Sequence, residues 1–132
     1  MRNDRRSFIA LAAGLSAVAT GAVARDAAAG ELFVFLYQKG PAWKPGLPME
    51  KQALRGHVVY MQSLADAGKL FAGGRFMTSE GGMAIVTAAN LDEAKAMLAA
   101  DPAVTGGVFT GELQHWVPRF RSTGPLPGRA GA

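Results

Sequence analysis

The 132-residue sequence contains no cysteine, which excludes disulfides, thiolate metal sites, iron–sulfur clusters and cysteine nucleophiles. Charged residues make up only 18% of the chain, and the formal net charge is +4. Half of that charge belongs to residues 1–29, and no run of Lys or Arg occurs in the remainder. A nucleic-acid surface needs basic residues clustered on one face. We therefore expect no nucleic-acid partner.

Histidine is scarce as well, with only His57 and His115 in the chain. Their separation does not match the ligand spacing of a structural zinc site. The sequence also lacks a glycine-rich phosphate loop of the Walker or dinucleotide-binding type. We predict no metal and no cofactor, and a heme held by one histidine stays open as the alternative.

The first 29 residues have the order of a secretory signal peptide. Early arginines precede an uncharged run rich in Ala, Leu and Val over residues 8–24, and small residues suit cleavage after Ala24 or after Ala29. The apolar run is short and weakly hydrophobic for a membrane span. We therefore predict a signal peptide over residues 1–29 and no membrane attachment after its cleavage.

The type of signal is indicated by the pair Arg5-Arg6, which Ser7, Phe8 and Ile9 follow. This order resembles the twin-arginine export motif, which directs proteins across the membrane after they have folded. An ordinary Sec signal with two arginines by chance is the alternative. Either signal predicts a periplasmic or secreted protein.

The residues after the signal predict the order strand, helix, strand, strand, helix, strand. Six consecutive apolar residues over 32–37 are typical of a strand buried on both faces. From Glu50 the apolar residues recur at three- and four-residue steps, which favours a helix that ends at Gly68. Asn90 and Glu93 form a capping-box pattern for the second helix. The remaining strands are predicted over residues 69–76, 82–88, 104–109 and 112–117, the last two being one strand broken by glycines.

This order predicts an α+β fold, a ferredoxin-like βαββαβ unit with both helices on one face of an antiparallel sheet. The domain is expected over residues 30–121, and residues 122–132 are expected to be a disordered tail. Because the first strand is apolar on both sides, the second sheet face is expected to need a cover. We expect a homodimer, with sheet packed on sheet in a dimeric α+β barrel; a monomer with one wet face is the alternative.

The stretch from Leu32 to Trp116 resembles the YCII-related (YciI-like) domain family. The resemblance rests on the apolar first strand and on the joint order of Arg55, His57, Leu64, Gly68, Leu70, Gly73 or Gly74, Gly82, Asp101-Pro102, Gly106 or Gly107, and Trp116. It implies the same ferredoxin-like dimeric barrel and an active site built around His57 and Asp101. Some members of the family are lyases that remove chloride from a chlorinated hydroquinone.

His57 lies on the apolar face of the first predicted helix, and Asp101 ends the second one before Pro102. In the predicted topology the end of the second helix approaches the start of the first, so the two side chains are able to meet. We hypothesise that Asp101 orients the imidazole and that His57 is a general acid–base; a core imidazole with one satisfied hydrogen bond is the alternative. Arg55 and Arg75 are candidates to hold an anionic group, with a solvated arginine as the alternative for each. The predicted function is a cofactor-free lyase or isomerase acting on a small apolar or aromatic molecule. The alternative is a dimeric module that binds such a ligand without turnover.

Overall fold

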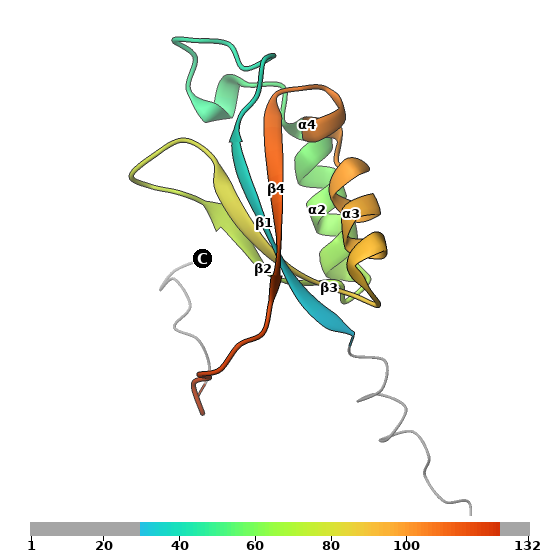
Figure 1. The fold of residues 1–132 in the computed structure, drawn as a ribbon. Helices are drawn as coiled ribbons and strands as arrows, with labels where there is room; N and C mark the ends of the chain where they lie inside the picture. The colour runs from blue at the N-terminus through green and yellow to red at the C-terminus, as the bar shows by residue number, and fades with distance from the viewer. Residues whose placement is uncertain (1–29, 125–132) are drawn as a thin grey trace, which may run out of the picture.

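The computed structural model describes residues 30–124 (Figure 1). The predicted signal peptide, with both cleavage positions, and the predicted tail beyond residue 124 lie outside the described residues. The main elements are β1 (Glu31–Lys39), α2 (Arg55–Asp66), β2 (Leu70–Arg75), β3 (Gly82–Ala88), α3 (Leu91–Ala99) and β4 (Phe109–Trp116). A 3₁₀ turn η1 (Met49–Lys51) precedes α2, and a short helix α4 (Pro102–Thr105) follows α3.

The four strands form one antiparallel sheet in the order β2-β3-β1-β4. The helices cover one face of this sheet (Figure 1). Phe35 stands at the centre, paired with Ala84 of β3 on one side and with Leu113 of β4 on the other. The α+β fold and the ferredoxin-like order of elements are therefore as predicted.

The central strand β1 alternates in burial. Phe33, Phe35 and Tyr37 face the helices and are buried, whereas Leu32, Val34 and Leu36 face the other side and are half-buried. The prediction of a strand buried on both faces thus holds for one face within a single chain. Covering of the second face by another copy stays a prediction.

Helix α2 begins at Arg55, five residues later than the predicted start at Glu50. The side chain of Gln52 explains the delay, because it is buried and bonded to the preceding loop. It accepts a hydrogen bond from the Lys44 amide at 2.9 Å and donates to the carbonyls of Lys44 and Leu47 at 2.8 and 2.9 Å. These three bonds fix the segment before the helix in a non-helical path.

Both helix boundaries that rested on capping residues are confirmed. Gly68 ends α2 with a φ of +71°, and the Lys69 amide bonds the Leu64 carbonyl at 2.8 Å, as in a Schellman motif. Asn90 caps α3 by accepting from the Glu93 amide at 2.9 Å.

One prediction for the second half of the chain was wrong. The strand predicted over residues 104–109 begins only at Phe109, because Val104 and Thr105 belong to helix α4, where Pro102 suits the first helical position and Asp101 caps the helix ahead of it. In β2, the register shift between Leu70 and Ala72 marks a β-bulge at Phe71. Among residues 30–124, no helix is both long enough and apolar enough to cross a bilayer.

Candidate functional site

The contact between Gly56 of α2 and Pro102 of α4 brings two distant segments together. A Cβ atom at Gly56 would lie 3.0 Å from the Cβ of Pro102, so only glycine permits this approach without displacing the proline. Glycine inside a helix costs about 1 kcal/mol relative to alanine. Because Gly56 precedes His57 and Pro102 follows Asp101, the close packing places these two side chains beside each other.

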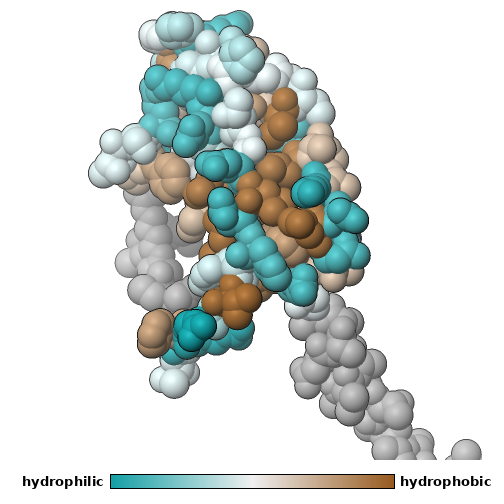
Figure 2. Space-filling view, viewed as in Figure 1, coloured by the Kyte–Doolittle hydropathy of each residue, from teal (hydrophilic) through white to brown (hydrophobic). Residues whose placement is uncertain are grey.

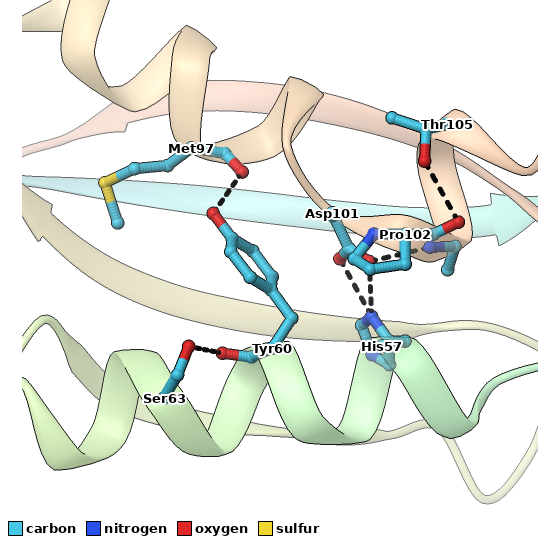
Figure 3. A network of polar contacts seen from close by, with 8 residues as sticks. His57, Tyr60, Ser63, Met97, Asp101, Pro102 and Thr105 are labelled. Carbon is cyan, nitrogen blue, oxygen red and sulfur yellow. Dashed lines mark hydrogen bonds and ion pairs between the residues drawn. The ribbon is translucent and has the colours of Figure 1, made fainter.

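His57 and Asp101 form a hydrogen-bonded pair (Figure 3). The Nδ1 atom of His57 lies 2.8 Å from Oδ2 and 3.0 Å from Oδ1 of Asp101. Asp101 is fully buried, and its Oδ1 also accepts from the Ala103 amide at 2.9 Å. A buried carboxylate is costly unless donors surround it, and these contacts supply them. Asp101 follows the C-terminal end of α3, as predicted, and it also caps the N-terminus of α4.

The pair determines which nitrogen of the neutral His57 ring carries the proton. Since the carboxylate accepts at Nδ1, that nitrogen carries the proton and Nε2 holds the lone pair in the neutral ring. Among residues 30–124, none hydrogen-bonds Nε2. The ring is held by edge contacts with Tyr37 and Phe109, at centroid distances of 5.2 and 5.6 Å. The imidazole is therefore oriented from three sides.

A cavity of about 610 Å³ lies in front of this ring, between α2, the β2–β3 hairpin and η1. That volume is within the roughly 300–1,000 Å³ of small-molecule sites. On the helix side Val58, Met61 and Ala65 line it, and in β2 and β3 three glycines lie among the larger lining residues Leu70, Arg75 and Met83. Val58 and Ala65 follow the three- and four-residue apolar periodicity of the predicted helix, which is typical of a core-facing side; both are exposed and belong to the cavity wall instead.

Three charged side chains line the same cavity: Arg55, Arg75 and Glu50. Arg75 forms an ion pair with Glu50 of η1. Arg55, the first residue of α2, is exposed and has no ion pair within the described part of the chain. The pKa of Glu50 is lowered by a hydrogen bond with its own backbone and next by the bond with Arg75. Of the four predicted site residues, the structure brings His57 and Asp101 into direct contact. Arg55 and Arg75 line the same cavity as His57, but within residues 30–124 neither is bonded to the pair.

Tyr37 belongs to the site although the sequence predicted core packing as its commoner role. It is buried, its ring lines the cavity, and its hydroxyl has no hydrogen-bond partner within residues 30–124. Burial raises the pKa of Tyr37, and the negative charge of Asp101 raises it further. The same two causes raise the pKa of Tyr60, whose hydroxyl donates to the Met97 carbonyl at 2.7 Å (Figure 3). A signal for Tyr37 was present in the alternation of β1, which points every second side chain toward the helices.

No metal site is formed by the described residues: no three His, Asp or Glu side chains within 30–124 gather closely enough to hold an ion. The prediction that the protein uses no cofactor stays a prediction.

Residues 32–114 match the YCII-related domain, and the chain belongs to this family. No curated protein matches the chain. Among solved structures, it is similar to 5-chloro-2-hydroxyhydroquinone dehydrochlorinase (TftG) from Burkholderia phenoliruptrix AC1100, in complex with 2,5-dihydroxybenzoquinone. The identity is 24% and the TM-score 0.51, over 65% of this chain and 93% of the other. At this identity the similarity shows a shared fold.

The two tyrosines provide a test of the buried charge at Asp101. Their folded-state pKa values lie above the ordinary value of 10.0, so the stability that the neutral phenols provide is fully present below pH 10 and is lost as the pH rises further. In an ultraviolet titration at pH 10, the folded protein should show less tyrosinate than the denatured chain, which should be half ionised. Tyr37→Phe should leave one late-titrating tyrosine and extend the folded range to higher pH. A tyrosine that ionises normally in the folded protein would contradict the placement of Tyr37 beside Asp101.

Proposed function

We propose that the protein is a cofactor-free enzyme of the lyase or isomerase type, with His57 as general acid–base and a small apolar or aromatic molecule as substrate. One observation carries the proposal: His57 bonds a fully buried Asp101 through Nδ1 and also lines a cavity of about 610 Å³. A core histidine with a satisfied hydrogen bond would not need an open cavity beside it.

In the proposed reaction, Nε2 of His57 takes a proton from a carbon or hydroxyl of the substrate. The electron pair of that bond forms a new double bond, and a leaving group departs with the electron pair of its own bond. In an isomerisation, the same proton returns at another atom. Asp101 keeps the proton on Nδ1 and stabilises the imidazolium that forms, without itself being protonated.

The family and its solved relative support this class of reaction. TftG is described as a dehydrochlorinase of a hydroquinone, and its complex holds a substituted benzoquinone. Loss of hydrogen chloride is an elimination that needs a base and a pocket for an aromatic ring. In this chain, Val58 and Met61 offer apolar contacts to such a ring, and we propose that Arg55 and Arg75 bind its anionic group.

The function is tested with chloride release from 5-chloro-2-hydroxyhydroquinone and, separately, with the dissociation constant of 2,5-dihydroxybenzoquinone. His57→Gln should lower the rate by at least about 100-fold, the lower end for general acid–base catalysis, while binding changes little.

Asp101→Asn should also lower the rate of chloride release. The asparagine side chain still accepts a hydrogen bond from the Ala103 amide, but it lacks the negative charge that stabilises an imidazolium.

Circular dichroism of each variant separates loss of chemistry from loss of folding. A wild-type protein that binds the quinone tightly and releases no chloride would favour the non-catalytic binding module instead. Variants of His57 and Asp101 that retain full activity would contradict the assigned chemistry.

We propose further that two copies pack through the sheet face that the helices leave open. Leu32, Val34 and Leu36 of β1 lie on that face, next to Met83 and Ile85 of β3. Met83 is 39% exposed. Figure 2, viewed toward the edge strand β4, shows hydrophobic residues gathered between this strand and the helices. Burial of such an apolar face in a homodimer is favourable by about 25 cal/mol for each Å² removed from water.

We also propose that the protein is exported, through the twin-arginine route, on the sequence pattern of residues 1–29. This route carries folded proteins, so that a dimer is able to form before translocation. The site would then work in the periplasm or outside the cell.

One preparation tests export and assembly together. Protein recovered from the periplasm of a bacterial host should begin at Arg25 or Gly30, and it should sediment at twice the mass of one mature chain. Leu36→Glu, on the open sheet face, should yield a monomer, while Leu47→Glu in an exposed loop should remain dimeric. An uncleaved chain confined to the cytoplasm would contradict export, and a folded wild-type monomer would contradict the interface.

A further inference from the structure

An ion pair lies at the mouth of the cavity. Glu50 comes from η1 and Arg75 from the end of β2, so the pair joins two segments on opposite sides of the opening. Their side chains are 61% and 47% exposed, which places the pair at the rim rather than in the interior. With the unpaired Arg55 nearby on the same wall, the mouth carries two positive charges and one negative charge.

The backbone that carries Glu50 is fixed, but its side chain is not. The Lys51 amide bonds the Pro48 carbonyl at 2.9 Å, and the Gln52 amide bonds the Met49 carbonyl at 3.1 Å. Gln52 further anchors the turn to the preceding loop through its side chain. Glu50 can therefore leave Arg75 by rotating its own side chain toward water, without movement of the loop.

The energy of such a pair is small. Exposed ion pairs are worth roughly 0–1 kcal/mol, because water and salt screen both charges. A ligand anion that reaches Arg75 forms a charge-assisted hydrogen bond with the guanidinium, so it is able to compete with this weakly held surface carboxylate.

We propose that Glu50 is an internal counter-ion for Arg75, and that the anionic group of the ligand displaces it on binding. The site then selects small apolar molecules that carry a carboxylate or oxyanion over neutral molecules of the same shape. The apolar body of the ligand lies against Val58 and Met61, and its anionic end lies at the rim. The inference rests on the proposed function, since it concerns the ligand of the same cavity.

The experiment compares benzoate with benzyl alcohol, a neutral molecule of similar shape, by their dissociation constants for the mature protein. Glu50→Gln should tighten benzoate binding about three-fold, because Arg75 no longer has a competing carboxylate, and should leave benzyl alcohol unchanged. Arg75→Gln should weaken benzoate about ten-fold and remove most of the selectivity.

Glu80→Gln is the matched control. Glu80 also forms an exposed ion pair, with Lys39, but does not line the cavity, so this variant changes the net charge equally and should bind both probes as the wild type does. Benzoate binding that weakens in Glu50→Gln, or that changes equally in Glu80→Gln, overturns the inference. A wild-type protein that binds benzyl alcohol with the same affinity as benzoate also overturns the inference.

Failure of the proposed reaction and failure of the counter-ion role can be distinguished, because the binding measurements do not depend on turnover. If Glu50→Gln sharpens the preference for benzoate while the wild type has no lyase activity, the counter-ion role stands and the proposed reaction is wrong. If the enzyme is active while Glu50 and Arg75 variants bind both probes as the wild type does, the counter-ion role alone is wrong.

Discussion

The site depends on one buried charge, the carboxylate of Asp101. Without water, this group needs donors, and the fold supplies them from two directions: the Ala103 amide of α4 and the Nδ1 atom of His57 from α2. The second bond joins residues 44 positions apart in the chain. It fixes the imidazole and leaves Nε2 as the nitrogen available to the cavity.

The surrounding packing makes that bond possible. Gly56 lets α4 approach α2 closely, and Tyr37 and Phe109 hold the imidazole by its faces and edges. The hairpin of β2 and β3 contributes glycines where bulkier residues would fill the cavity. The protein therefore combines a tightly packed end, where the histidine is oriented, with a loosely packed side, where a ligand has room.

The sequence predicted the fold well because its signals are local. The stop at Gly68, the cap at Asn90 and the apolar strand over 32–37 depend on residues adjacent in the chain, and the structure contains all three elements. It was weaker where a distant contact decides. The start of α2 depends on the bonds of Gln52 to an earlier loop. The short helix α4 was missed although its signals, the cap at Asp101 and the proline after it, are local.

The site was predicted in part for the same reason. His57 and Asp101 were identified through the family resemblance and the antiparallel helices, and their bond has the proposed partners. Val58 shows the limit: periodicity places it on the apolar face of α2, but it does not distinguish a core from a cavity wall. Glu50 carries no pattern of its own, and the alternation of β1 places Tyr37 on the helix side without showing its proximity to Asp101; both roles arise from contacts across the fold.

The most direct test of the central claim is the tautomer of His57, measured by long-range proton–nitrogen NMR at mildly alkaline pH. Free histidine prefers the proton on Nε2, whereas the bond to Asp101 predicts the proton on Nδ1 and an unprotonated Nε2. Addition of a cavity ligand should then shift the Nε2 resonance more than that of Nδ1. An Nε2-protonated ring, or one averaging between tautomers as in the unfolded chain, would contradict the account.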